Sequence, residues 1–263
     1  MEKIEFEERA VAFLDILGFK DFIAKAEQAG TNEHMKFGEL IEVINNHVKF
    51  DNYELTTPEQ LHPAYIFISD SIVVSAPLRN NNNGTTYSGL ITVTVKVAQI
   101  SLKLLEMGFL IRGGISVGNV CHSDGNIFGT GYIDAFKAEQ QSCHPRIVYD
   151  VKAASLISGT SELHFGYPLN SYHVWIEYEG QWVADTLHPI YVDDSYYPGK
   201  RIDEITAPVF EKCKSNINSA LKACPLGSPP RGKWEWMAGF FNAALRRHSI
   251  NSVSPFIDIP LPD

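Results

Sequence analysis

The spacing of hydrophobic positions changes abruptly near the start of the chain. Residues 11–14 form an unbroken apolar run, typical of a buried strand, and the next apolar positions recur every three or four residues, as on one face of a helix. These helical positions are Phe19, Phe22, Ile23 and Ala26. The pattern predicts a strand that ends at Asp15, a turn at Gly18 and a helix from Phe19.

Similar patterns predict most of the remaining chain. Two runs rich in β-forming residues within positions 64–77 flank Ser69-Asp70-Ser71, which predicts a tight hairpin. Helices are expected at residues 33–48, 90–105, 132–140, 151–157, 204–222 and 234–247, and strands at 109–120, 147–149, 172–178, 182–186 and 189–193. Loops are expected at 51–62, 79–87 and 126–131, a surface turn at 193–199 and a rigid linker at 224–232.

Composition narrows the class of protein. The chain has 263 residues, 44% of them hydrophobic, which is enough for the core of one large domain or two small ones. No apolar run reaches the ~18 residues of a membrane span, and the polar N-terminus does not resemble a signal peptide, so a cytoplasmic protein without membrane contact is expected. The net charge of −9 argues against a nucleic-acid groove. The four cysteines lack paired spacing, which favours reduced thiols.

Three polar side chains stand where the apolar pattern breaks. Asp15 ends a strand beside the start of a helix, and a divalent metal that bridges it to a phosphate would suit both the acid and the helix start. Asp70 occupies a hairpin tip, and Arg112 precedes two glycines in a strand, which indicates close approach of a backbone or ligand. The plainer alternatives are a helix cap for Asp15, a turn residue for Asp70 and an edge-strand arginine paired with a surface acid for Arg112.

Two aspartates on adjacent strands can bind two divalent ions roughly 3.5–4 Å apart, which would bridge a triphosphate and lower the pKa of a ribose hydroxyl. Other catalytic schemes lack support. The chain has no glycine-lysine-serine/threonine string, so a P-loop enzyme is not indicated.

Four segments in order resemble the motifs of class III nucleotidyl cyclases. The likeness runs from about residue 9 to residue 140, roughly half of the chain. It comprises residues 13–19 (Phe-Leu-Asp-Ile-Leu-Gly-Phe) as the first metal motif, Ser69-Asp70-Ser71 as the second, residues 112–118 (Arg-Gly-Gly-Ile-Ser-Val-Gly) as the phosphate-binding strand, and Phe128-Gly129 with residues 135–138 as the aromatic-glycine pair and the base-and-transition-state helix.

The resemblance implies an α/β (α+β) palm-like, ferredoxin-like fold that works as a head-to-tail homodimer with shared active sites. It implies that Asp15, Asp70 and the Ile16 carbonyl bind two divalent metal ions, Mn²⁺ or Mg²⁺, and that Lys137 acts from the second protomer on the nucleoside triphosphate. The expected catalytic residues are Asp15, Asp70, Arg112 and Lys137, and the expected nucleotide-binding residues are Phe13, Ile16, Leu17, Gly18, Phe19, Tyr65, Arg112 and Asn126.

Four departures concern the base and the transition state. Where purine cyclases of this family have a base-reading lysine, a base-reading acid, an asparagine and an arginine, this chain has Ile66, Asn126, Ile133 and Lys137. Because both aspartates and Arg112 are present, a rebuilt base site is favoured over a loss of catalysis.

The resemblance is then closest to the bacterial Pycsar pyrimidine cyclases, which make cyclic UMP or cyclic CMP in antiphage defence, with UTP favoured here and CTP next. Tyr65, Phe67 or Asn126 would line the smaller base pocket. A purine cyclase and a non-catalytic nucleotide-binding domain are the alternatives. Residues 1–160 are expected to form the catalytic core and residues 161–263 hairpin strands and C-terminal helices packed on it; a single domain is the other possibility.

Overall fold

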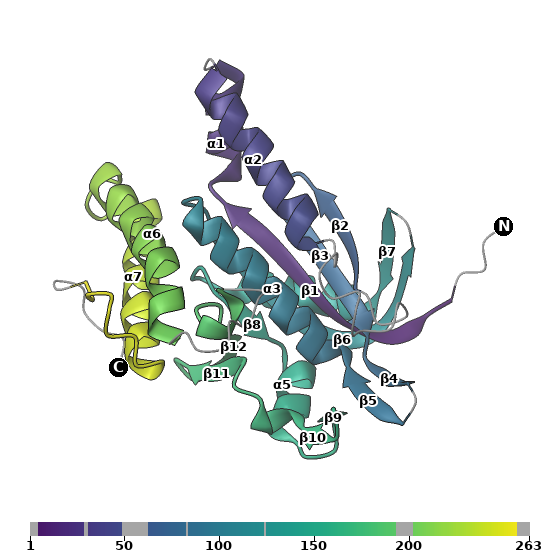
Figure 1. Cartoon of the computed structure of the whole chain (residues 1–263). Helices are drawn as coiled ribbons and strands as arrows, with labels where there is room; N and C mark the ends of the chain where they lie inside the picture. Colours follow the sequence, from purple (N-terminus) through teal and green to yellow (C-terminus); the bar gives the residue numbers. More distant parts are fainter. Residues whose placement is uncertain are drawn as a thin grey trace.

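The computed structural model describes residues 5–28, 31–48, 63–82, 84–123, 125–192 and 202–256. Its centre is an eight-stranded sheet with the order β11-β12-β8-β6-β1-β3-β2, in which β7 also pairs with β6 (Figure 1). The sheet strands are β1 (Glu7–Leu17), β2 (Ala64–Ile68), β3 (Ser71–Pro77), β6 (Leu110–Ser123), β7 (Asn126–Gly129), β8 (Ile147–Tyr149), β11 (Trp175–Tyr178) and β12 (Gln181–Ala184).

Helices and two small hairpins surround this sheet. The helices are α1 (Phe19–Gln28), α2 (Thr31–Val48), α3 (Gly89–Glu106), α4 (Thr130–Gln141), α5 (Val151–Ser158), α6 (Ile202–Ala223) and α7 (Pro229–Arg247), with short turns η2 (Leu169–Ser171) and η3 (Pro189–Tyr191). The hairpins are β4 (Arg79–Asn82) with β5 (Thr85–Ser88), and β9 (Leu163–His164) with β10 (Tyr167–Pro168).

Four central strands have the connectivity of a ferredoxin-like fold. β1 is antiparallel to β3 on one side and to β6 on the other, and β2 is antiparallel to β3. The helices α1 and α2 therefore connect β1 to the parallel strand β2, and α3 connects β3 to the parallel strand β6, which is the split β-α-β arrangement. The α/β fold with a ferredoxin-like core that the sequence predicts is confirmed.

Alternation along β1 separates two apolar clusters. Leu14 and Ile16 point to the face covered by α2 and α3, where the main core lies (Figure 1). Val11 and Phe13 point to the other face, where α4 covers β1 and β6. Asp15 follows Phe13 by two residues and so lies on the α4 face.

Two glycines allow α4 to pack directly on β6. A Cβ atom on Gly114 would lie 2.2 Å from the Ala135 carbonyl oxygen and 2.6 Å from the Glu139 nitrogen, both in the backbone of α4. A Cβ atom on Gly113 would lie 2.6 Å from a side-chain carbon of Leu14. The expectation that these glycines mark a close approach is confirmed, and the element that approaches is a helix.

The C-terminal third continues the same sheet. β12 pairs with β8 through Val183 and Val148, and β11 adds to β12. The helices α6 and α7 form an antiparallel pair beside the sheet (Figure 1), and Arg231 closes the turn between them by donating to the carbonyls of Leu221 and Cys224. Within the described ranges, no helix combines the length and apolar character that a membrane span requires.

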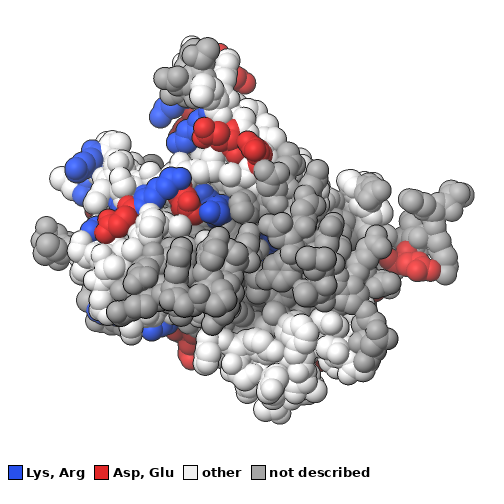
Figure 2. Space-filling view, viewed as in Figure 1, with Lys and Arg blue, Asp and Glu red and all other residues white. Residues whose placement is uncertain are grey.

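Charges on the surface are mixed. Figure 2 shows basic and acidic side chains side by side where α3 meets α6. Glu106 at the end of α3 lies 3.1 Å from Lys103 and 3.8 Å from Lys212 on α6, so this acid has two basic neighbours.

Two segments predicted as loops are strands. Residues 79–82 and 85–88 form the β4–β5 hairpin, because the backbone pairing and the ion pair between Arg79 and Glu162 outweigh the low strand preference of the asparagine run. Residues 126–129 form β7, which turns back along β6 through Gly125 with a φ of 80°. Both predictions rested on local composition and were wrong.

Two further predictions need correction. The sequence predicts a strand at 189–193, but its described part (189–192) is not one: Pro189–Tyr191 is a short 3₁₀ turn, in which the His188 ring nitrogen accepts from the Ile190 N–H at 3.2 Å. The linker predicted at 224–232 is shorter, because α7 begins at Pro229 with Ser228 as its N-cap. The segments 51–62 and 193–199 lie outside the described residues.

Candidate functional site

Asp15 and Asp70 meet at one end of the sheet. Asp15 pairs with Ser71, the first residue of β3, and the Asp70 carbonyl accepts a hydrogen bond from the Ile16 N–H at 2.9 Å. Ser69 has a φ of 60° and supplies the left-handed residue that turns the hairpin. The negative charge of Asp70 raises the pKa of Asp15, so the two carboxylates are near enough to interact. The structure therefore brings together the two acids that lie far apart in the sequence.

The surroundings of Asp15 disfavour its negative charge. Burial is the largest cause that raises its pKa, and the charges of Glu139 and Asp70 raise it further. Arg112 and Lys233 act in the opposite direction, and the net pKa is above the usual value for aspartate. A cation bound beside Asp15 would remove this penalty.

Arg112 lies across from Asp15 in the register of β1 and β6. Its Nη2 is 3.5 Å from the Asp15 Oδ2, its Nη1 donates to the Ser142 carbonyl at 3.2 Å, and its Nε donates to Glu139 at 2.5 Å. Nη2 also forms an ion pair with Glu139, whose side chain is completely buried. The alternative of an edge strand and a surface acid is wrong, because β6 lies inside the sheet and the acid is internal.

The oxygen atoms at this end of the sheet suit a hard divalent cation. Asp15 and Asp70 offer carboxylates, and Ile16 offers a carbonyl that points the same way as its N–H, toward the Asp70 turn. Such oxygen ligands favour Mg²⁺ or Mn²⁺. Among the described residues no three or more His, Cys, Asp or Glu side chains converge as a metal site, so water and phosphate oxygens would complete the coordination.

The turn after β1 presents its backbone next to these acids. Gly18 has a φ of 78°, lies exposed, and would have no atom within 4 Å of a Cβ. Its carbonyl accepts from the Phe22 N–H at 3.1 Å, which opens α1, while Leu17 is half-buried and Phe19 is buried. The turn thus has the open backbone that a phosphate would need.

Of three further predicted site residues, one is enclosed beside Asp15 and two lie away from it. The Phe13 ring is buried 5.1 Å from the Phe136 ring of α4. Tyr65 alternates with Ile66, which faces α4, so the Tyr65 side chain points to the opposite face from Asp15. Asn126 pairs with Ser123 at the far end of β6. Ser123 is about 11 residues from Arg112 along this strand, so at about 3.3 Å per residue Asn126 and Arg112 are separated by a distance on the order of 35 Å.

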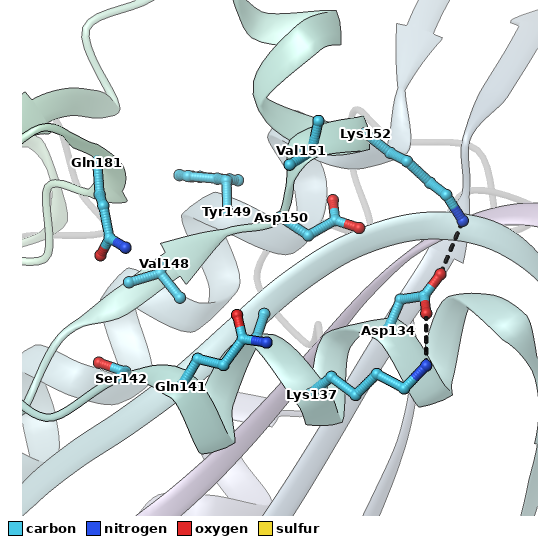
Figure 3. Close-up of a pocket in the computed structure, with 11 residues that line it drawn as sticks. Asp134, Lys137, Gln141, Ser142, Val148, Tyr149, Asp150, Val151, Lys152 and Gln181 are labelled. Carbon is cyan, nitrogen blue, oxygen red and sulfur yellow. Dashed lines mark hydrogen bonds and ion pairs between the residues drawn. The ribbon is translucent and has the colours of Figure 1, made fainter.

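Lys137 faces a separate pocket. The pocket has a volume of about 340 Å³ and lies between α4 and the β8–α5 segment (Figure 3). Lys137 is 63% exposed and lies 3.5 Å from Asp134, which also accepts from Lys152 of α5 at 2.7 Å. Figure 3 shows both lysines directed at Asp134, with Gln141 and Gln181 further along the lining. Within one chain, Lys137 therefore pairs with Asp134 and does not contact Asp15 or Asp70.

Sequence reasoning missed two residues of the carboxylate end. Glu139 lies two positions after Lys137 in a predicted helix, and its place among alanines that pack on the sheet is a signal that could have identified it. Lys233 falls between the predicted linker (224–232) and the predicted helix (234–247), and nothing in the local sequence connects it to Asp15.

Comparisons with known proteins are distant. A scan of protein-family models gives no match, and a search of curated proteins gives none. One similar solved structure is the catalytic core of a rhodopsin-guanylyl cyclase with converted specificity in complex with ATPαS, at 15% identity, covering 68% of this chain and 96% of that one with a TM-score of 0.37. Another is a class III adenylyl cyclase-like ATP-binding protein from Pseudomonas aeruginosa, at 13% identity, covering 63% of this chain and 39% of that one, also with a TM-score of 0.37. Likenesses this distant transfer neither an activity nor a residue's role.

Proposed function

We propose that this chain is a nucleotidyl cyclase that converts a pyrimidine nucleoside triphosphate, UTP in preference and CTP next, to its 3′,5′-cyclic monophosphate and diphosphate. The observation that carries the proposal is the meeting of Asp15 and Asp70 on adjacent strands, with Arg112 directly opposite Asp15. The segments that contain these residues resemble the metal-binding and phosphate-binding motifs of class III nucleotidyl cyclases, and this resemblance suggests the reaction.

The reaction is attack of the ribose 3′-oxygen on the α-phosphorus, with diphosphate as the leaving group. Two divalent ions held by Asp15, Asp70 and the Ile16 carbonyl would ionise the 3′-hydroxyl and neutralise charge on the phosphates. Arg112 is already bound to Glu139 and the Ser142 carbonyl, so it acts on the phosphates mainly through its charge. The backbone at Gly18 offers the N–H donors of the turn to the β- and γ-phosphates.

The base site is proposed to come from a second protomer in a head-to-tail homodimer. Asn126 lies at the end of β6 remote from Asp15, and Lys137 faces the pocket at Asp134, so one chain does not bring them to the same nucleotide. A partner chain in the opposite orientation would supply both. Ile66, in place of a base-reading lysine, lies on the α4 face and favours a base other than a purine.

Product analysis tests the activity. The purified chain is incubated with each of the four nucleoside triphosphates and Mn²⁺, and products are identified by mass. Cyclic UMP, with less cyclic CMP, is expected, and Asp70→Asn is expected to abolish both. The fold should persist, because within the described ranges Asp70 is held by a backbone hydrogen bond and by none through its side chain. Product from ATP or GTP alone would favour a purine cyclase, and binding without product a non-catalytic domain.

Mixing two inactive variants tests the shared site. Asp70→Asn and Lys137→Ala each remove one half of a site, so a mixed dimer has one site with both halves intact and one with neither. With random exchange, half of the dimers are mixed, and activity should return to about a quarter of the unmodified value. No recovery, despite exchange of subunits, would contradict the shared arrangement.

The proposed role of the product is that of a second messenger in antiphage defence, as the resemblance to the Pycsar cyclases suggests. Bacteria that express the chain are infected with phage, and nucleotides are extracted over the infection. A rise of cyclic UMP that is absent in cells with the Asp70→Asn chain is expected, and a constant level would argue against this role.

A further inference from the structure

The pocket between α4 and the β8–α5 segment brings two lysines to one carboxylate (Figure 3). Lys152 of α5 donates to the Asp134 Oδ2 at 2.7 Å, and the Lys137 Nζ lies 3.5 Å from the Asp134 Oδ1. The side chains of Lys137 and Lys152 are 63% and 55% exposed. An ammonium group has three donors, and each of these two contacts a single oxygen of Asp134, so donors remain for a ligand in the pocket.

The second acid that lines the pocket is occupied within the chain. Asp150 accepts from the Ser116 hydroxyl of β6 at 2.7 Å, and as the N-cap of α5 it accepts from the Ala153 N–H at 2.8 Å. These bonds fix the start of α5 on β6 and so hold Lys152, two residues later, at the edge of the pocket. Among the described lining residues, Asp134 is therefore the acid that faces both lysines, and the accessible charge favours an anionic ligand.

The pocket has room for part of a nucleotide. Its volume of about 340 Å³ lies at the lower end of the range of small-molecule sites, about 300–1,000 Å³. Ala138 of α4 and Val148 of β8 form an apolar floor, and Gln141 and Gln181 add amide groups further along the lining (Figure 3). Ammonium and amide N–H groups are donors to phosphate oxygens, so the lining suits a phosphate chain.

The nucleotide needs a cation that Arg112 supplies only in part. Arg112 forms an ion pair with the buried Glu139, which balances much of its charge. In the proposed homodimer, Lys137 of one chain reaches the phosphates of the nucleotide held by the other. Lys152 shares the carboxylate of Asp134 with Lys137, so phosphates that reach one ammonium group also meet the other.

We infer that Lys152 binds the phosphate chain of the nucleotide together with Lys137, in exchange for their contacts with Asp134. The inference rests on the proposed function, since it adds a residue to the same shared site. A single lysine lacks the parallel donors of an arginine fork, and two lysines directed at one point supply them. Asp134 competes with the phosphates for both ammonium groups.

The first test measures binding. Inorganic triphosphate with Mn²⁺ is titrated calorimetrically into the full chain and its variants. Lys152→Gln is expected to raise the Kd about tenfold, which corresponds to ~1.4 kcal/mol, and Lys152→Arg to keep it within about twofold. The matched control is Lys212→Gln, which should change the Kd less than about twofold. Lys212 is 61% exposed and likewise lies near an acid, 3.8 Å from Glu106.

Asp134→Asn separates a binding role from a structural one. It removes the competing carboxylate and keeps both lysines, so it is expected to lower the Kd for triphosphate about threefold. A loss of affinity in both Asp134→Asn and Lys152→Gln would show that the ion pair only supports the local structure, and would contradict the inference. Circular dichroism checks that each variant is folded.

Mixing variants tests whether Lys152 acts in the shared site. An equal mixture of Lys152→Gln and Asp70→Asn should reach about a quarter of the unmodified activity, because each mixed dimer has one intact site. A mixture of Lys152→Gln and Lys137→Ala should show no such gain, since both lysines belong to the same half. The reverse pattern would overturn the inference.

The outcomes separate the inference from the proposed function. If Lys152→Gln binds triphosphate as tightly as the unmodified chain, or if the unmodified chain binds none, the inference is wrong, and the cyclase proposal stands wherever a cyclic product forms. If no nucleoside triphosphate gives a cyclic product but triphosphate binding depends on Lys152, the cyclase proposal is wrong and the phosphate site stands. Absence of both product and binding contradicts both.

Discussion

The buried ion pair between Glu139 and Arg112 makes a quantitative prediction about stability. Glu139→Gln preserves the shape of the side chain and removes its charge, leaving Arg112 with the Ser142 carbonyl and a 3.5 Å contact to Asp15. The Glu139 side chain is 0% exposed and that of Arg112 is 22% exposed, so water replaces little of what is lost.

The size of the effect follows from this burial. Removing one partner of a buried ion pair typically costs about 3–5 kcal/mol. The loss should be smaller here, because glutamine still offers an oxygen acceptor to the Arg112 guanidinium and Asp15 still partly neutralises its charge. We therefore expect the free energy of unfolding to fall by about 2–3 kcal/mol. The measurement is urea unfolding at pH 7, followed by the fluorescence of the four tryptophans.

A matched control separates the buried pair from an ordinary one. Glu235 pairs with Arg231 at 2.7 Å, one helical turn away, and its side chain is 47% exposed. Glu235→Gln should change the free energy of unfolding by no more than about 0.5 kcal/mol. A loss below about 1 kcal/mol for Glu139→Gln, or one equal to that of the control, would refute the argument that this pair stabilises the site.

Three other predictions, the first with a control substitution, test the packing and the charges. Gly114→Ala should cost about 3 kcal/mol or prevent folding, because its Cβ would overlap the α4 backbone, whereas Gly232→Ala, with no atom within 4 Å, should be neutral or stabilising by up to about 1 kcal/mol in thermal unfolding. Burial alone would raise the pKa of Asp185, but hydrogen bonds from His248 and Arg247 hold it below the usual value, so Asp185→Asn should destabilise most at pH 7 and progressively less as the pH falls below about 4. The opposite sign holds for Asp15, whose raised pKa makes its ionised form unfavourable: Asp15→Asn should raise the melting temperature by about 2–4 °C at pH 7, and the gain should disappear below about pH 4.

The carboxylate pair could be predicted because each acid is placed by its own local pattern. Asp15 ends an apolar run and Asp70 occupies the tip between two β-rich segments, and the ferredoxin-like topology then sets the two strands side by side. Arg112 could be placed in a strand for the same reason, and the following glycines indicated that another element comes close.

The partners of these residues could not be predicted in this way, since they depend on how distant elements pack. Glu139 reaches Arg112 only because α4 lies on Gly114, and the charge of Lys233 acts on Asp15 only because the fold brings together segments that are far apart in the sequence. Local composition also misled where pairing decides the structure, as in the asparagine-rich hairpin that begins at Arg79.

The continuity of the sheet past residue 160 has a practical consequence for dissecting the protein. β12 covers the outer edge of β8, and Val183 pairs there with the buried Val148. A chain cut after residue 160 would expose the hydrogen-bonding groups of that edge together with its apolar side chains, which is a template for self-association. A minimal soluble version of residues 1–160 would therefore have to retain the β11–β12 hairpin or carry charged residues along β8.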